Sequence, residues 1–195
     1  MAMTANRFTI PASVAVVNGY LKMKSATCGV EDITDIGIFE YVEPLANSTT
    51  TIPAGGAWTK LKNAGTDATT YKVRPDSVTE VYDTSLTEFD FSELGIADSV
   101  NIRIDCEITS TVVDTEFEIK LVQAEGAASE RDIFYHQGYH PTASTKRISI
   151  MNGVFIRDAD VRNNPATFYA SSALGCSIKV SSYYCQVFKR GWVQP

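Results

Sequence analysis

The feature of this sequence that most constrains its fold is a strict alternation of apolar and polar residues from Ser99 to Ile108. Successive side chains of a strand point to opposite faces, so the pattern predicts an antiparallel strand with one buried face. Residues 111–122 repeat the alternation after the short link Thr109-Ser110, which predicts that the two strands form a hairpin. The residues expected to point inward are Val100, Ile102, Ile104, Cys106, Ile108, Val113, Phe117, Ile119 and Leu121.

Further β-rich runs are separated by turn-forming clusters such as Asn152-Gly153 and Asn163-Asn164-Pro165. No amphipathic helix of three turns is predicted. We therefore expect an all-β fold, an antiparallel β-sandwich of jelly-roll-like topology with an extended N-terminal arm. The additional strands are expected at 33–42, 69–73, 78–82, 86–91, 132–136, 146–151, 154–161, 166–171 and 175–190.

Two segments are expected along the chain. Residues 1–68 are predicted to be an N-terminal arm and linker with one or two strands, and residues 69–195 to be the jelly-roll sandwich. Many non-local strands leave open sheet edges, and oligomerisation is a common way to cover them.

The composition limits the partners that we expect. Of the 195 residues, 17 are basic and 23 acidic, which gives a net charge of −6. Nucleic acid and anionic membranes attract positive charge, so neither is an expected partner. No run approaches the roughly 20 apolar residues that cross a bilayer. The four cysteines, which form no C-x-x-C pair, are expected to be reduced thiols of a protein made in a cytoplasm; they are Cys28, Cys106, Cys176 and Cys185.

Two segments have the residue types of a metal site. His136 and His140 are four residues apart, but Gln137-Gly138-Tyr139 and Pro141 favour a loop, and no third ligand lies nearby. Residues 158–164 loosely resemble a calcium loop without its turn glycine or its closing glutamate. We expect no metal site, and we favour a strand in which Arg162 pairs with a neighbouring carboxylate.

Catalytic motifs are not apparent in the sequence. Paired carboxylates, such as Asp105 with Glu107 and Glu116 with Glu118, fall on the expected outward faces of strands. No nucleophile elbow, phosphate-binding glycine loop or zinc-protease motif occurs. We expect no enzymatic activity, no catalytic residue and no cofactor.

Aromatic residues are the remaining candidates for recognition. Phe89, Phe91, Phe117 and Phe168 suit a sandwich core, and the adjacent Tyr183 and Tyr184 are expected on opposite faces of one strand. Trp58, Tyr135 and Tyr139 are the candidates for a ligand-binding loop, with burial in a core or a subunit contact as the alternative for such residues.

Three segments resemble the jelly-roll domains of tailed-phage virion proteins: IRDADVRNNPATF at 156–168, CSIKV at 176–180 and YCQVFKR at 184–190. The similarity covers roughly 78–192 and is greatest to head decoration, or cement, proteins. It implies a structural protein on the capsid exterior, made in the host cytoplasm, that binds the major capsid protein of the assembled shell and stabilises it as a homotrimer. The apolar residues expected to contribute to the shell contact are Phe8, Ile10, Val14, Val16 and Val17.

Two alternatives remain open. The chain also resembles a receptor- or carbohydrate-binding tip domain of a tail fibre or baseplate, which would use Tyr135, Tyr139 and Trp58. A small glycan-active enzyme is the third hypothesis, and only the strand carboxylates suggest it.

Overall fold

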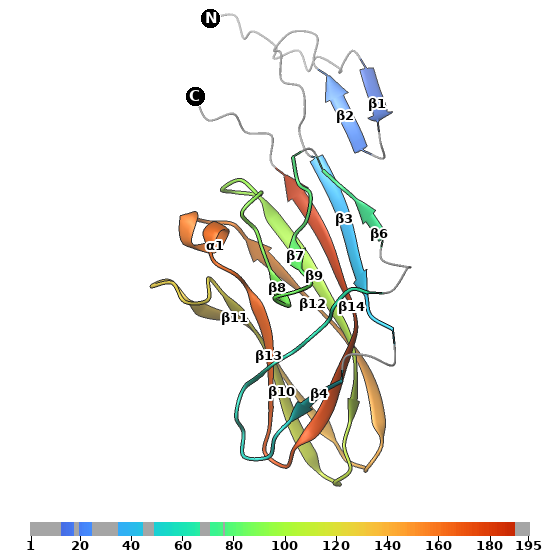
Figure 1. Ribbon diagram of the computed structural model, residues 1–195. Coiled ribbons are helices and arrows are strands. Elements are labelled where there is room, and N and C mark those ends of the chain that lie inside the picture. The colour runs from blue at the N-terminus through green and yellow to red at the C-terminus, as the bar shows by residue number, and fades with distance from the viewer. Residues whose placement is uncertain are drawn as a thin grey trace, which may run out of the picture.

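The computed structural model describes residues 13–17, 20–24, 35–44, 49–66, 71–75 and 77–189 (Figure 1). Its regular structure consists of antiparallel strands and one short helix. These are β1 (Ser13–Val17), β2 (Tyr20–Lys24), β3 (Asp35–Val42), β4 (Thr49–Ile52), β5 (Thr59–Lys60), β6 (Tyr71–Val73), β7 (Tyr82–Asp83), β8 (Glu88–Phe89), β9 (Ser99–Thr109), β10 (Thr115–Gln123), β11 (Arg131–His140), β12 (Thr145–Phe155), α1 (Ala159–Asn163), β13 (Thr167–Ser172) and β14 (Cys176–Lys189).

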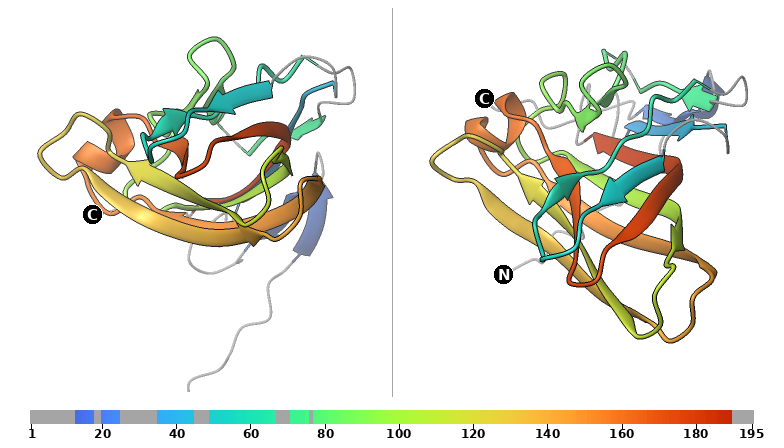
Figure 2. Two further views of the ribbon diagram at one scale, coloured as in Figure 1. Left: turned by 90° about the horizontal axis from the view of Figure 1, so that it is seen from below. Right: turned by 60° about the horizontal axis from the view of Figure 1, so that its bottom comes forward.

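The strands form two main sheets that pack face to face (Figure 2). The six-stranded sheet has the order β12-β9-β14-β3-β6, with β4 also paired to β14, and the four-stranded sheet has the order β11-β10-β13-β5. Four strand pairs are nested along the chain: β10 with β11, β9 with β12, β5 with β13 and β4 with β14. Such nesting describes a long hairpin wrapped over two sheets, which is a jelly roll. The predicted all-β sandwich is confirmed.

Strand β14 organises the six-stranded sheet. One of its edges pairs with β9 from Ser177 to Phe188, and its other edge pairs first with β4 and then with β3. Strands β3, β4 and β5 therefore belong to the sandwich, which draws its strands from both sides of the boundary predicted between residues 68 and 69. In the described part of the predicted arm, β1 and β2 form an antiparallel hairpin next to β3 (Figure 1).

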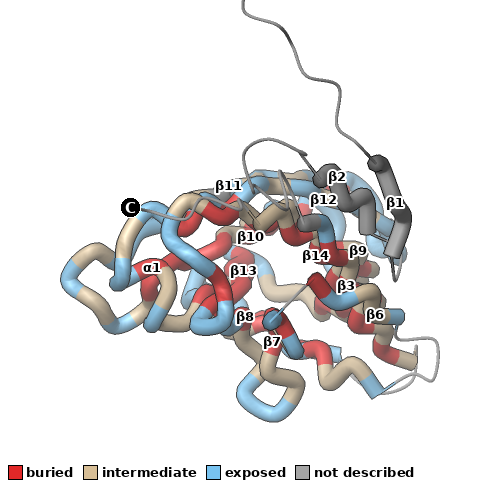
Figure 3. Tube along the Cα trace, turned by 90° about the horizontal axis from the view of Figure 1, so that it is seen from above, coloured by how far each residue is buried: buried red, intermediate tan, exposed pale blue. Residues whose placement is uncertain are grey.

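The core lies between the two sheets (Figure 3). All five apolar residues predicted on one face of β9 are buried, and so are Phe117, Ile119 and Leu121 of β10. In β14 the buried positions change from even to odd numbers at an irregularity in the pairing between Val180 and Ser182. Tyr183 is buried as a result, while Tyr184 faces outward, as expected for the pair. The predicted core phenylalanines Phe89, Phe91, Phe117 and Phe168 are all buried.

The predicted hairpin of the first two alternating segments is wrong. Strand β9 pairs with β12 and β14, whereas β10 pairs with β11 and β13, so consecutive strands lie in opposite sheets. Residues 110–114 cross from one sheet to the other, with Asp114 at a φ of 58°. Val113, predicted to point inward, is 56% exposed because β10 begins only at Thr115.

Two turn or loop predictions fall inside long strands. Asn152-Gly153 was expected to be a turn, but β12 continues through it, and Asn152 Nδ2 donates to the carbonyl of Ile133 at 3.1 Å. The loop expected around His136 and His140 is part of β11. Tertiary pairing with β9 and β10 outweighs the local turn preference of these residues.

The strand predicted over 154–161 is also wrong, because β12 ends at Phe155 and α1 follows. Asp158 is the N-cap of α1, and its carboxylate accepts a hydrogen bond from the amide of Val161 at 3.0 Å. Arg157, rather than Arg162, pairs with this carboxylate at 2.7 Å. Arg162 donates instead to the side-chain amide of Asn163 at 3.0 Å.

The three cysteines in the described part of the chain are free thiols, in agreement with the sequence-based expectation for them. Cys106 and Cys185 are buried in the core, and Cys176 is partly buried at the start of β14. Burial raises the pKa of the Cys106 thiol to about 12, so this side chain acts as a small apolar core residue.

Candidate functional site

The aromatic residues predicted to form a ligand-binding loop lie instead on the outer face of the four-stranded sheet. Tyr135 and Tyr139 extend from β11, and Trp58 immediately precedes β5. Their exposed fractions are 54%, 48% and 38%, which are high for large aromatic side chains. We call these three residues the aromatic platform.

The indole of Trp58 reaches β11 although β5 and β11 are at opposite edges of this sheet. Its ring centroid lies 6.3 Å from that of Tyr135, with the two planes at 66°. The ammonium group of Lys120 lies 4.5 Å from the centre of the indole and 3.1 Å from a carboxylate oxygen of Asp132. The structure therefore brings together Trp58 and Tyr135, two residues that are far apart in the sequence.

Polar side chains hold the exposed tyrosines in place. A hydrogen bond to Glu118 raises the pKa of Tyr135, and a hydrogen bond to Asp114 raises the pKa of Tyr139. Both hydroxyls donate to these carboxylates. Glu118 also accepts from Gln137 Nε2 at 3.4 Å, so a row of polar groups runs along β11 between the two rings.

A shallow hollow of about 180 Å³ adjoins the platform. The hydroxyl of Tyr169 donates to Glu125 at its rim. Burial, followed by this carboxylate, raises the pKa of Tyr169. The hollow is lined by Trp58, Lys120, Val122, Glu125, Glu130 and Tyr169.

A second surface lies at the end of the sandwich where four loops meet, which is the lower end in Figure 1. The loops are residues 53–57, 110–114, 141–144 and 173–175, and Asp114 is their one charged residue, although 21% of the whole chain is charged. Backbone hydrogen bonds join the loops in pairs, from Gly55 to Ala173 at 3.0 Å and from Ser110 to Ser144 at 3.1 Å. We call this surface the uncharged tip.

Apolar side chains of the uncharged tip are open to solvent. Val112, Val113 and Leu174 are 42%, 56% and 47% exposed. Thr109, the last residue of β9, pairs with Thr145 of β12 and with Ser177 of β14. The loops attached to these three strands therefore lie next to one another at the same end of the sheet. Exposed apolar side chains on a surface with little charge make the tip a candidate for contact with another protein.

Two of the strand carboxylates considered for catalysis, Asp105 and Glu107, are engaged in structural contacts. Asp105 accepts from Arg103 and from Ser182, both at 2.9 Å, and Arg147 lies 2.6 Å from Glu107. Each carboxylate serves to join neighbouring strands on the outer face of the six-stranded sheet.

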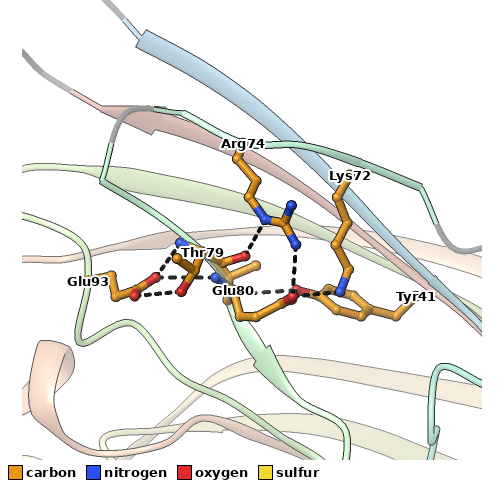
Figure 4. Close-up of polar contacts among 7 residues, drawn as sticks. Tyr41, Lys72, Arg74, Thr79, Glu80 and Glu93 are labelled. Carbon is orange, nitrogen blue, oxygen red and sulfur yellow. Dashed lines mark hydrogen bonds and ion pairs between the residues drawn. The ribbon is translucent and has the colours of Figure 1, made fainter.

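Another cluster of charged groups fixes the segment after β6 to the six-stranded sheet (Figure 4). Glu80 accepts from the hydroxyl of Tyr41 at 2.8 Å and from Lys72 Nζ at 2.7 Å. The Tyr41 oxygen in turn accepts from the amide of Val81 at 3.2 Å. Glu93 accepts from the hydroxyl of Thr79 at 2.6 Å and from the amide of Glu80 at 3.2 Å. Protein groups thus satisfy both carboxylates, which indicates a structural role.

We expect this cluster to make the stability of the protein sensitive to acid. The Thr79 hydroxyl, with the amides of Thr79 and Glu80, lowers the pKa of Glu93 below its ordinary value of 4.5. The unfolded state binds protons at a higher pH, so this contribution is complete above about pH 4.5 and is lost as the pH falls through the folded-state pKa. We expect Glu93→Gln to lower the urea midpoint at pH 7 and to flatten its decrease between pH 5 and pH 3. An unchanged slope in this variant would contradict this assignment.

The N-terminal residues predicted to contact the shell fall partly outside the described residues. Phe8 and Ile10 lie outside the described residues. Val14, Val16 and Val17 belong to β1, opposite Met23, Leu21 and Tyr20 of β2. No group of three or more potential metal ligands occurs in the ranges that the structure describes. In the same ranges, no helix has the length and apolar character needed to traverse a lipid bilayer.

Comparisons with known proteins add little. No protein-family model and no curated protein sequence matches the chain. Among solved structures, it is similar to Eiger TNF from S. frugiperda, with a TM-score of 0.44 and 7% identity over 83% of this chain and 96% of that one. It is also similar to the PRD1 vertex protein P5, with a TM-score of 0.39 and 12% identity over 90% and 79% of the two chains. At these identities and TM-scores, the likenesses do not bear on function.

An infectious bursal disease virus structure, Gx strain, is similar with a TM-score of 0.40 and 10% identity over 95% of this chain. The chain spans 38% of the length of that one. The fold and the two surfaces together define a jelly-roll protein with an uncharged tip and an aromatic platform, and no family is assigned beyond that.

Sequence reasoning missed the uncharged tip as a possible binding surface. Each loop is visibly free of charge in the sequence, apart from Asp114, but the four segments are spread from residue 53 to residue 175. Only the nested strand pairing brings them to one end of the sandwich.

Proposed function

We propose that this chain is a structural protein of a virus particle, namely a head decoration protein that binds the major capsid protein of an assembled tailed-phage shell and stabilises the shell from outside as a homotrimer. The observation that carries the proposal is the uncharged tip, in which four loops present exposed apolar side chains and one charge. The jelly-roll architecture and the sequence resemblance of residues 156–168, 176–180 and 184–190 to virion proteins support the same class.

The physical argument for docking through the tip concerns desolvation. Burial of a charged group at an interface costs free energy unless the partner supplies a matching charge. Apolar side chains gain when their surface is removed from water, and backbone groups of the loops can be satisfied by hydrogen bonds to the partner. Interface centres are accordingly depleted of charged residues. The tip has this composition, whereas both outer sheet faces carry many charges.

Shell stabilisation follows from linkage. A protein that binds the expanded shell, but not its separated subunits, shifts the equilibrium toward the assembled particle by mass action. The N-terminal arm, with Phe8, Ile10, Val14, Val16 and Val17, stays a candidate for a second contact with the shell. Deletion of residues 1–24 tests the arm separately from the tip.

The test is co-sedimentation with purified expanded shells, using a matched pair of variants. Val113 and Ile96 are both 56% exposed, but Val113 follows β9 in the tip and Ile96 precedes β9 at the other end of that strand. We expect Val113→Asp to weaken binding at least tenfold, because it places a charge in the contact, and Ile96→Asp to bind like the unmodified protein.

Equal binding by both variants would show that the tip is not the contact. Failure of the unmodified, folded protein to sediment with expanded shells would overturn the decoration function itself. Light scattering of the protein and of its shell complex tests the homotrimer, which requires three times the chain mass of 21.3 kDa.

A further inference from the structure

We propose that the aromatic platform binds a neutral, linear oligosaccharide that lies along β11. The inference goes beyond the decoration function and does not depend on it, because Trp58 and Tyr135 lie outside the uncharged tip, which the platform adjoins only where Tyr139 donates to Asp114. It rests on three features of the platform: exposed rings, polar groups fixed between them, and an acidic surrounding.

The rings provide stacking surfaces at two places along the strand. The ring planes of Trp58 and Tyr135 are inclined at 66° to each other, and Tyr139 lies four residues further along β11. At about 3.3 Å per residue, the two tyrosines are about 13 Å apart, a separation greater than one sugar ring spans. The C–H faces of successive sugar rings stack on aromatic rings, so the arrangement suits a chain of sugars rather than a single one.

Polar groups between the rings match the hydroxyls of a sugar. The amide of Gln137 lies between the two tyrosines on the same strand face, and its nitrogen donates to Glu118 at 3.4 Å. The other carboxylate oxygen of Glu118 accepts from the Ser171 hydroxyl at 3.2 Å. Ligand sites commonly combine apolar walls with a few such fixed polar groups, and here the protein holds those groups before any ligand binds.

Charge decides which ligand fits. The carboxylates of Asp114, Glu116, Glu118 and Asp132 lie on or beside the platform, and the nearby ammonium group of Lys120 is occupied by Asp132 and the Trp58 ring. Nucleic acid bases also stack on aromatic rings, but their phosphates need a positively charged groove. The acidic surface repels phosphates and sulfated or carboxylated sugars, so a neutral glycan is the favoured ligand.

The experiment titrates the folded full-length protein with neutral hexasaccharides: chitohexaose, cellohexaose and maltohexaose, with a heparin hexasaccharide as the anionic probe. In a Trp192→Phe background, Trp58 is the only tryptophan, so its fluorescence reports on the platform. We expect at least one neutral hexasaccharide to change this fluorescence and to bind at least tenfold more tightly than the corresponding monosaccharide.

A matched pair of variants locates the site. Tyr135 on the platform and Tyr71 on β6 of the other sheet are 54% and 56% exposed, so replacing either one disturbs the core little. We expect Tyr135→Ala to weaken hexasaccharide binding at least tenfold and Tyr71→Ala to leave it unchanged, with urea midpoints confirming that both variants fold.

Three results would overturn the inference. These are no binding of any of the three neutral hexasaccharides, equal weakening by Tyr135→Ala and Tyr71→Ala, or tighter binding of the heparin probe than of the neutral ones. A fourth result, a change of oligomeric state in Tyr135→Ala, would also overturn it and would assign the platform to subunit contact. None of these results affects shell binding through the tip, so failure of this inference and failure of the decoration function are distinguishable.

Discussion

Replacement of Gly138 by alanine is expected to destabilise the protein by about 1–3 kcal/mol, although alanine is a small residue and Gly138 lies in a regular strand. Gly138 is paired with Phe117 across β10 and β11. A β-carbon at position 138 would lie 2.6 Å from the Cε1 and Cε2 atoms of the Phe117 ring and closer still to Cζ. The ring is 1% exposed, and protein cores are closely packed, so the core or β11 must shift.

Urea denaturation at fixed protein concentration measures this effect, and the variant Gly153→Ala is the control. At Gly153, in the exposed face of β12, an added β-carbon meets only a side-chain oxygen of Asn101 at 3.2 Å, so Gly153→Ala is expected to change stability by less than about 1 kcal/mol. In a Phe117→Leu background, the cost of Gly138→Ala is expected to fall, because the ring that it contacts is gone. An undiminished cost in that background would refute steric overlap with Phe117 as the cause.

Tyr183→Ala is expected to be still more destabilising, by about 3–5 kcal/mol, enough to unfold a domain of ordinary stability. Tyr183 is 1% exposed and lies at the centre of the aromatic cluster between the sheets. Its ring centroid is 5.0 Å from that of Tyr82, 5.1 Å from that of Phe89 and 5.6 Å from that of Phe168. These neighbours come from β7, β8 and β13, so the truncation removes packing that joins the six-stranded sheet to the rest of the core.

Two variants bracket the Tyr183 prediction. Tyr183→Phe retains the ring and removes only the hydroxyl, so it is expected to cost no more than about 1.5 kcal/mol, the upper end of what one hydrogen bond contributes. Tyr184→Ala alters the next residue, which faces outward over Arg103 with 4.9 Å between the guanidinium carbon and the ring centre. It is expected to cost less than half as much as Tyr183→Ala. If both alanine variants had equal urea midpoints, the placement of these two side chains on opposite faces would be incorrect.

The sequence predicted which face of a long strand is buried better than it predicted the neighbouring strands with which that strand pairs. In β9, five apolar residues alternate with polar ones, and all five are buried, because a strand with one buried face needs that period. The same alternation does not reveal which sheet a strand joins. The short link Thr109-Ser110 between the two alternating segments predicts that they pair, yet β9 and β10 are separated by five residues and the backbone crosses between the sheets at 110–114.

Strand ends were predicted less well, because turn preferences compete with pairing. The alternation that predicted an inward Val113 extends into the tip loop, and Asn152-Gly153 lies within β12, where pairing with β9 overrides the turn preference. The helix α1 did have a recognisable signal. An Asp at position 158, an acidic residue in the first turn and Asn164 before Pro165 are the usual marks of a helix start and stop.

The candidate surfaces could be predicted only in part. Trp58, Tyr135 and Tyr139 were recognised as candidate ligand-binding residues from their residue type, but the meeting of Trp58 with Tyr135 depends on the pairing of β5 with β13 and of β10 with both β13 and β11. The tip depends on pairings between segments more than one hundred residues apart, such as Ile52 with Cys176. Local sequence patterns carry no information about such pairs.

The most direct test of the decoration function is the temperature at which expanded, DNA-filled heads release their DNA, measured by a fluorescent DNA dye with and without the protein. The account predicts that the release temperature rises with added protein and reaches a plateau at a fixed ratio of this chain to major capsid protein, and that Val113→Asp shifts the plateau to higher protein concentration. An unchanged release temperature in the presence of saturating folded protein would contradict it.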